Sequence, residues 1–556
     1  MLTLEDPGTL VDPGLFAGNW NYDENVVAGL GLAGTVTVDD ENTFYATPGA
    51  FSILTRDVRL KAHVFFPADM PGVTDPAQIS ATKPHYPLVV IVHGNGHDYT
   101  TYDFLLQHLA LNGFIAASID NRFVSGGALV HGMHGLGRAN NFFEHLPVLK
   151  TKFGVKVEDN IGVMGHSRGG EAVLKIARLN QQTALGHRIK ALISLAPTDQ
   201  YGRETLQAPY ATPYFVLYGS RDGDVKGWYP WFPPFDWRMT GFSLYDRAGD
   251  APKSTAFVYR ATHNGFITSN FDNPGDQPLP PATQHTIVQA YLTAFFRQHL
   301  RGERRWNGMF ANELRPASVA ATGAEIYMQH RTPGGKVIDD FQTAGTNWKS
   351  STIGGTVSHG GTLPVDPSKG RLFDFPPTNP GLDTQSPHDT KGLKIRWDNT
   401  GGQLGRLVWT IPHAHRNVKK FGALSLRVTQ KEGSASNPAD QPQDFALGLT
   451  DSAHHQRAIR ASAFGEVPFP DQRSNSDLRK SAMTTIVVPL AMYTIKCLGQ
   501  PKVDLEKIVE FFLDLSLKST GEIEVDDIGF THCARGTEAD DGEQDEDGEQ
   551  DEKEKD

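Results

Sequence analysis

The sequence predicts an α/β domain with a mostly parallel sheet, followed by an all-β sandwich and a disordered acidic tail. Three observations support this. From residue 51 to 315, strand-like runs alternate with helical ones, which is typical of α/β domains. From 336 to 535 the segments are short and have period two, and 537–556 is strongly acidic. At 556 residues, the chain is also too long for one ordinary core.

The first domain is expected over 51–315, after a Gly-rich and weakly patterned N-terminal extension at 1–50. The run at 86–94 is continuously apolar, which is typical of a parallel strand buried on both faces. We expect further strands at 58–67, 114–120, 160–165, 189–197 and 214–220, and helices at 102–113, 139–154, 171–182 and 284–302.

After a linker at 316–335, the second domain is expected over 336–535. In "FFLDLSL", Phe511, Leu513, Leu515 and Leu517 fall on one face, and the intervening polar residues fall on the other. Such segments predict an all-β sandwich.

The net charge of −12 comes mainly from residues 537–556, which hold twelve acidic residues and two lysines. This tail predicts disorder. Elsewhere basic residues form no stripe, so nucleic acid is not an expected partner. No apolar run is long enough to span a membrane and no secretory leader is evident, so we expect a cytoplasmic protein. Cys497 and Cys533 cannot form a disulfide framework, and whether they pair is left open.

The stretch "IGVMGHSRGG" places Ser167 in a G-x-S-x-G motif between an expected strand and an expected helix. In this setting, the glycines permit a strained turn that raises the serine above the carboxyl edge of the sheet. Because a neutral serine is a poor nucleophile, it requires a base and an orienting acid.

Those partners are expected after later strands, in the order acid then histidine. Asp222 follows the strand "YFVLYG", and His263 follows "FVYRAT" just before the last long helix. Asp224 competes with Asp222 for the role of the acid, and we favour Asp222. The oxyanion requires two N–H donors, for which the candidates are the backbones of Arg168 and Asn95.

These stretches resemble α/β-hydrolases of the serine esterase type. The likeness covers 51–315 and is close to the branch that holds bacterial cutinases and polyester hydrolases, dienelactone hydrolase-like proteins and plant chlorophyllases. The elbow of the chlorophyllases also reads "GHSRGG". It implies a triad of Ser167, Asp222 and His263, with Asn95 and Arg168 as the oxyanion hole and no cofactor. Asn95 stands where cutinases usually carry an aromatic residue, which puts a polyester substrate in doubt.

An aromatic-rich segment lies between the acid and the histidine. We expect it to form a lid or the wall of an acyl pocket, or else to pack on its own domain or on the sandwich. The candidate pocket residues are Trp228, Tyr229, Trp231, Phe232 and Trp237.

Other candidate sites are weaker. Histidine pairs at 131/134, 413/415 and 454/455 lack convergent carboxylates, and no metal motif is evident. The second domain begins "KVIDDFQTAGTNW" and ends "GEIEVDDIGF", and paired first and last strands of this kind resemble the galactose-binding-like jelly rolls that serve as carbohydrate-binding modules. The resemblance implies a glycan partner. Trp348, Trp397 and Trp409 would then stack on sugars, although core positions are more typical of tryptophan, and Asp339, Asp340, Asp526 and Asp527 could hold calcium.

The sequence therefore predicts a serine hydrolase that cleaves a small or polymeric carboxylic ester. Two alternatives stay open. One is an amidase or peptidase that uses the same triad, since the fold does not separate these activities. The other is a carbohydrate-binding protein whose hydrolase domain is secondary.

Overall fold

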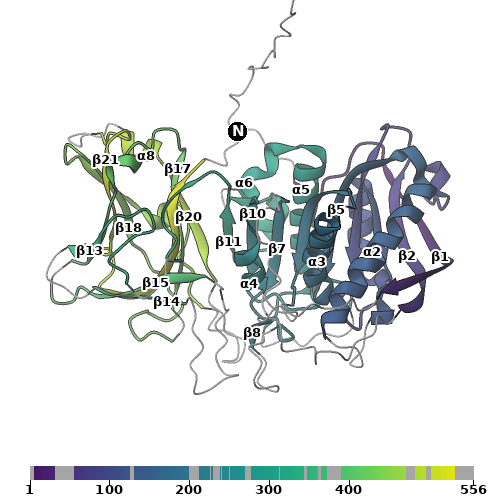
Figure 1. Cartoon of the computed structure of the whole chain (residues 1–556), viewed down its shortest axis with the longest axis horizontal. Coiled ribbons are helices and arrows are strands. Elements are labelled where there is room, and N and C mark those ends of the chain that lie inside the picture. The colour runs from purple at the N-terminus through teal and green to yellow at the C-terminus, as the bar shows by residue number, and fades with distance from the viewer. Residues whose placement is uncertain are drawn as a thin grey trace, which may run out of the picture.

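The structure is a computed structural model of the whole chain. It describes residues 6–31, 55–124, 131–183, 185–198, 212–225, 227–228, 238–239, 241–249, 251–269, 277–311, 314–342, 347–360, 365–371, 388, 390–402, 404–431, 433–470, 482–495 and 502–532. Two layered regions follow one another along the chain and lie side by side (Figure 1).

Within the described residues, a nine-stranded sheet forms the N-terminal region, in the order β1-β2-β4-β3-β5-β6-β7-β10-β11. The strands from β4 to β10 in this order are parallel, whereas β1, β2 and β11 run antiparallel to their neighbours. The bounds are β1 (Phe16–Gly31), β2 (Thr55–Ala68), β3 (Tyr86–Val92), β4 (Ile115–Ile119), β5 (Val157–His166), β6 (Arg188–Leu195), β7 (Tyr214–Gly219), β10 (Lys253–Val258) and β11 (Ile326–Arg331).

Helices cover both faces of this sheet. Alternate residues of β3 point to opposite sides, so that Val89 and Ile91 join one core and Val90 and Val92 join the other. One core includes α1 (Asp103–Leu111), α5 (Pro281–Arg301) and α7 (Ala317–Ala321), and the other includes α2 (His131–Phe153), α3 (Arg168–Gln182) and α4 (Gly241–Arg247). The expected α/β domain with a mostly parallel sheet is therefore confirmed. None of the described helices is both long and apolar enough to cross a bilayer.

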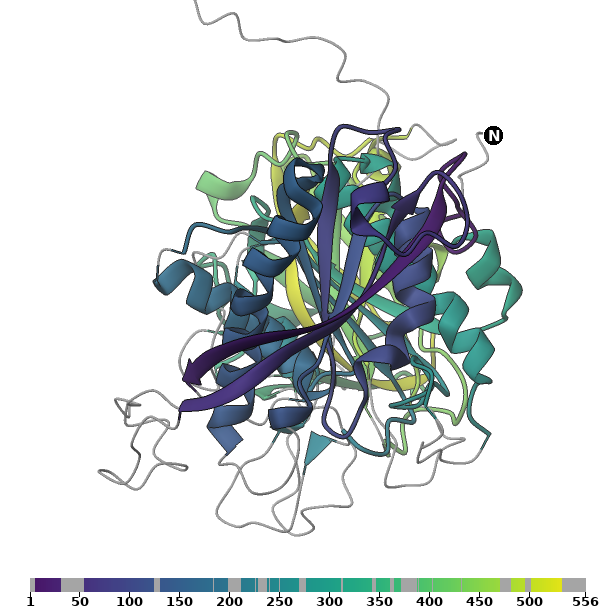
Figure 2. The same ribbon diagram turned by 90° about the vertical axis from the view of Figure 1, so that its right-hand side faces the viewer.

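The limits of this domain differ from the sequence expectation. Strand β1, which we expected within an N-terminal extension at 1–50, pairs with β2 and forms the edge of the sheet (Figure 2). Its many polar residues give no apolar pattern from which a strand can be predicted. Pairing at an edge depends on backbone hydrogen bonds rather than on apolar side chains. Strand β11, expected within the linker at 316–335, pairs with β10 and buries Ile326 and Met328. Helix α2 begins at His131 rather than at residue 139, although glycines disfavour helices.

Within the described residues, two antiparallel sheets form the C-terminal region. One has the order β14-β15-β22-β17-β20, with β12 also on β22, and the other has the order β13-β16-β21-β18-β19. Their facing side chains share one apolar core, as expected of a β-sandwich. The bounds are β12 (Lys336–Asp339), β13 (Val357–Gly360), β14 (Val365–Arg371), β15 (Lys391–Asp398), β16 (Arg406–Thr410), β17 (Ala423–Gln430), β18 (Ala446–Asp451), β19 (Gln456–Arg460), β20 (Thr484–Pro489), β21 (Ile508–Asp514) and β22 (Thr520–Thr531).

The period-two pattern at 511–517 is confirmed only in part. Phe511, Leu513 and Leu515 are buried in the shared core. Leu517 is 42% exposed, because β21 ends at Asp514 and the alternation of the strand does not continue to it.

The two regions pack against each other along β11 and β20. The hydroxyl of Thr484 donates to the carbonyl of Met328 at 3.1 Å, and the N–H of His330 donates to Thr485 Oγ1 at 3.0 Å. Tyr259 and Phe469 meet in a buried apolar cluster between the regions.

A buried ion cluster also joins the two regions. Arg427 of β17 donates to Asp246 of α4 at 2.9 Å, and its Nε lies 3.0 Å from Asp527 of β22. His388 Nδ1 lies 2.9 Å from the second carboxylate oxygen of Asp246. Burial alone would raise the pKa of Asp246, but the hydrogen bond with His388 and the guanidinium of Arg427 hold this pKa below its usual range. Asp246 therefore remains charged and ties α4 to the second region.

Candidate active site

Ser167 lies in a strained turn between β5 and α3. Its φ of 56° and ψ of −124° are unusual for a residue with a side chain. The carbonyl of Ser167 accepts hydrogen bonds from the N–H groups of Gly170 at 2.9 Å and Thr198 at 3.2 Å, and its own N–H donates to Leu195 at 2.9 Å. These bonds hold the strained backbone in place at the carboxyl edge of the parallel sheet.

The glycines around this turn are required by close backbone approach. A Cβ on Gly165 would lie 2.0 Å from the carbonyl oxygen of Gly169, and a Cβ on Gly169 would lie 2.0 Å from that of Val92. Both distances are far below van der Waals contact, and a shift of backbone would be needed to relieve them. The turn therefore has the features expected of a nucleophile elbow.

His263 and Asp222 are joined by a buried hydrogen bond. His263 Nδ1 lies 2.7 Å from Asp222 Oδ2, and neither residue is more than 2% exposed. The other oxygen of Asp222 accepts the N–H groups of Asp224 at 3.0 Å and Val225 at 2.7 Å. Because the carboxylate holds the proton on Nδ1, Nε2 is the basic nitrogen of the ring.

Asp224 occupies a different position from Asp222. Its Oδ2 lies 3.4 Å from His263 Nε2, and its side chain is 68% exposed. The two acids that the sequence left in competition therefore lie at opposite nitrogens of one imidazole. Only Asp222 has the burial and the Nδ1 contact that an orienting acid requires.

Three residues that the sequence analysis did not single out support the His263 turn. His166 Nε2 donates to the carbonyl of His263 at 3.0 Å, and the hydroxyl of Tyr102 donates to His166 Nδ1 at 3.1 Å. Burial lowers the pKa of His166 well below its usual range, which keeps the ring neutral. Gln284 Oε1 accepts the N–H of Thr262 at 3.0 Å. Since Ser167 directly follows His166, these contacts link the elbow to the histidine turn.

The loop after β3 lies beside Ser167. A Cβ on Gly94 would be 2.8 Å from the Cβ of Ser167, so the backbone of this loop passes close to the nucleophile candidate. Asn95 is the next residue, in a turn in which Gly96 has a φ of 73°. Arg168 is the first residue of α3, where N–H groups point away from the helix.

Two histidines of this loop are neutral groups rather than charged ones. His93 Nδ1 donates to the carbonyl of Gly94 at 2.8 Å, and its Nε2 accepts the N–H of Asn121 at 2.6 Å. Burial lowers the pKa of His93, and burial together with His263 lowers the pKa of His97 to about 4. The hydrogen bonds of His93 join this loop to the backbone of Asn121.

The candidate pocket residues lie outside the part of the chain that the structure describes. These are Tyr229, Trp231, Phe232 and Trp237, and of Trp228 only the backbone is described, in the short β8 (Gly227–Trp228).

Two of the three candidate tryptophans of the sandwich lie in its core, whereas Trp348 is only partly buried and packs against that core. Trp397 and Trp409 are at most 1% exposed, so they cannot stack on a sugar. In the described residues no group of three or more His, Cys, Asp or Glu is arranged to hold a metal. Asp339 accepts the indole N–H of Trp409 at 3.1 Å, and Asp527 contacts Arg427.

Comparison with known families bears on the first region. The chlorophyllase family model matches residues 48–215. This is an α/β-hydrolase family of ester hydrolases, and together with the sheet topology it supports a general serine hydrolase. The matched segment contains Asn95, Ser167 and Arg168, and it ends before Asp222 and His263. No curated protein matches this chain.

Proposed function

We propose that this protein hydrolyses carboxylic esters by a Ser-His-Asp mechanism without a cofactor. Ser167 is the nucleophile, His263 the base and Asp222 the orienting acid. The observation that carries the proposal is the 2.7 Å hydrogen bond between the buried Asp222 and His263, next to the strained turn of Ser167.

In the first half of the reaction, Ser167 Oγ attacks the ester carbonyl carbon while His263 Nε2 takes the hydroxyl proton. The carbonyl oxygen becomes negative and is stabilised by the N–H groups of Asn95 and Arg168. Each such donor contributes about 3 kcal/mol to stabilising the transition state. The carbon–oxygen bond to the alcohol then breaks as Nε2 returns its proton to the leaving alkoxide.

In the second half, water attacks the acyl-enzyme. His263 Nε2 takes a proton from the water and passes it to Ser167 Oγ as the acyl group leaves as a carboxylic acid. Asp222 keeps its proton-free form throughout and stabilises the imidazolium in each step.

Turnover of matched p-nitrophenyl esters and p-nitroanilides tests the reaction class. We expect the full-length protein to hydrolyse a short-chain ester far faster than the anilide of the same acid. Ser167→Ala should remove this activity, whereas Arg304→Ala, a change at an exposed arginine, should not. Faster cleavage of the anilide would favour the amidase alternative, and equal rates for Ser167→Ala and the unchanged protein would contradict the proposal.

A further inference from the structure

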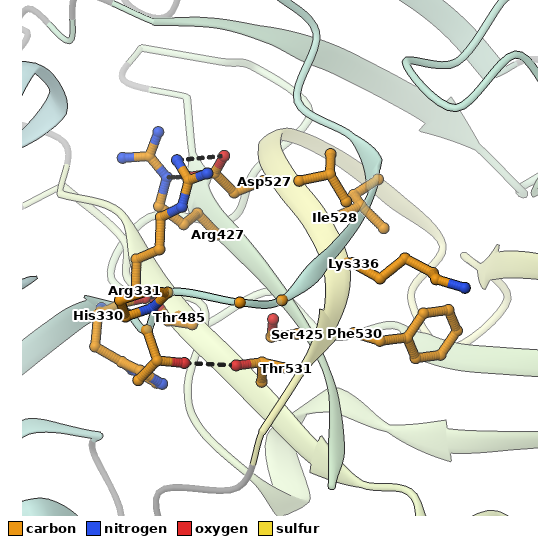
Figure 3. Close-up of a pocket in the computed structure, with 16 residues that line it drawn as sticks. His330, Arg331, Lys336, Ser425, Arg427, Thr485, Asp527, Ile528, Phe530 and Thr531 are labelled. Atoms are coloured by element: carbon orange, nitrogen blue, oxygen red, sulfur yellow. Dashed lines mark hydrogen bonds and ion pairs between the residues drawn. The ribbon is translucent and has the colours of Figure 1, made fainter. Parts of the chain in front are cut away.

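A cavity of about 330 Å³ lies where the chain passes from the first region to the second (Figure 3). One wall is the end of β11, the turn at 332–335 and the start of β12, and the other wall comes from β17, β20 and β22. This volume is within the range of pockets that bind small molecules, which is about 300–1,000 Å³. The cavity is separate from the candidate active site, because none of Ser167, Asp222 and His263 lines it.

The charged residues that line the cavity carry an excess of positive charge. The basic ones are His330, Arg331, Lys336 and Arg427, against a single acid, Asp527. His330 is uncharged at neutral pH, because burial lowers its pKa to about 4. The charge of the lining therefore depends on Arg331, on Lys336, and on how far acids neutralise Arg427.

Arg427 pairs with three acids, because its Nη2 also contacts the buried Asp526, whereas Arg331 and Lys336 make a long ion pair and contacts with uncharged groups, respectively. Arg427 contacts Asp246 at 2.9 Å and Asp527 at 3.0 Å. Arg331 is 40% exposed, and its nearest contact with Asp527 is long, at 3.9 Å. Lys336 Nζ donates to two backbone carbonyls, at 3.2 and 3.4 Å, which carry no net charge. The acids near Arg427 therefore offset its charge in full, and the cationic donor that remains for a ligand is the guanidinium of Arg331.

A β-bulge in β22 shapes the wall opposite Arg331. Ser425 pairs with Gly529 and Arg427 pairs with Asp526, so two residues of β22 face one residue of β17. Asp527 lies in this bulge with a φ of 47°, which is unusual for a residue other than glycine. Bulges re-aim side chains, and this one brings Asp527 toward Arg427 and Arg331.

Hydroxyl groups line the cavity beside its charged side chains. Thr332 Oγ1 and Thr531 Oγ1 lie 2.7 Å apart, and Ser425 lines the same cavity (Figure 3). The Thr531 hydroxyl also donates to the carbonyl of His532 at 3.4 Å, but each hydroxyl oxygen can still accept a hydrogen bond from a ligand. A ligand with several hydroxyl groups would match this lining.

We propose that this junction cavity binds a small polyhydroxylated molecule that carries one carboxylate or phosphate group. The guanidinium of Arg331 binds the anionic group, because its planar fork matches the oxygens of either anion. Ser425 and Thr531 bind the hydroxyl groups. The site does not depend on the esterase proposal, and it would make the contact between the two regions sensitive to a ligand.

Isothermal titration of the full-length protein tests this proposal with three probes: glucuronate, glucose 6-phosphate and neutral glucose. We expect at least one anionic probe to bind about ten times more tightly than glucose, or more tightly still. Whether that probe is glucuronate or glucose 6-phosphate distinguishes a carboxylate ligand from a phosphate ligand. Arg331→Ala should weaken that binding about tenfold, and Arg331→Lys should weaken it less. Arg304→Ala is the matched control and should bind as the unchanged protein does.

Three outcomes would overturn the proposal: failure of both anionic probes to bind the unchanged protein, binding of glucose as tight as that of the anions, or unchanged binding by Arg331→Ala. The thermal midpoint of each variant establishes that it is folded. If Arg331→Ala does not fold, Ser425→Ala is the deciding variant. It should weaken the binding of the same anionic probe, and that probe should still bind more tightly than glucose. Unchanged binding by a folded Ser425→Ala would then contradict the proposed hydroxyl contacts.

Discussion

Asp222 Oδ2 lies 2.7 Å from Nδ1 of His263, and both side chains are removed from solvent. A charge-assisted hydrogen bond of this kind holds the ring in one tautomer and in one orientation. It also leaves Nε2 as the nitrogen that can take a proton from a nucleophile.

Asp222→Asn should therefore lower kcat by about 10⁴-fold, with a much smaller effect on KM. The amide can donate to Nδ1, which would place the proton on the wrong nitrogen. Steady-state kinetics with a p-nitrophenyl ester measures this. A loss of kcat below about tenfold would show that Asp222 does not orient the base.

Asp224→Asn should have a different effect, on the pH profile rather than on the maximal rate. The Asp224 carboxylate lies 3.4 Å from Nε2 of His263, so its negative charge favours the protonated ring. Without that charge the ring loses its proton more readily, and the acid limb of kcat/KM moves to lower pH. Because Asp224 is 68% exposed, salt should reduce the shift. A shift to higher pH would contradict this account.

His299 should make the protein less stable in acid. Burial lowers the pKa of this residue of α5 to about 4, compared with about 6.5 in the unfolded chain. Between these values the unfolded chain binds more protons, so the free energy of unfolding falls as the pH falls from about 6.5 to about 4. His299 accounts for about 2 kcal/mol of the loss at pH 5, and this part should be absent in His299→Gln, while the part due to other buried histidines such as His330 remains. Urea unfolding at pH 7 and pH 5 compares the two proteins, and equal losses would contradict the prediction.

Arg427→Met should destabilise the contact between the two regions. It leaves the buried Asp246 without its guanidinium partner, and breaking a buried ion pair in this way costs about 3–5 kcal/mol. Denaturation followed by both tryptophan fluorescence and circular dichroism measures the loss. Arg304→Ala, at an exposed position, should change stability by less than about 0.5 kcal/mol. Equal effects of the two changes would show that the ion cluster does not stabilise the fold.

The local part of the site could be predicted from the sequence. Gly165 and Gly169 flank Ser167 because backbone atoms lie where a Cβ would be, and this requirement is visible in the motif. The strand before Ser167 and the helix after it were likewise predicted by hydrophobic pattern. Such features depend on residues that are close together in the sequence, so the spacing of apolar residues predicts them directly.

Long-range features could not be predicted in this way. Strand β1 owes its place to pairing with β2, and Arg427 is buried because carboxylates of two distant segments surround it. Tyr102 and His166 support His263 across the fold, and nothing in their sequence spacing indicates this. The sequence shows that polar residues are concentrated next to the buried strands, but it does not show which of these residues contact one another.

Labelling with a fluorophosphonate probe, followed by mass spectrometry of the labelled peptide, tests the central claim most directly. An activated serine attacks this probe, and the phosphonate stays on its oxygen. We predict one label, on Ser167, and no labelling of Ser167→Ala under the same conditions. A label on another residue, or an unlabelled protein that still hydrolyses esters, would contradict the assignment of Ser167 as the nucleophile.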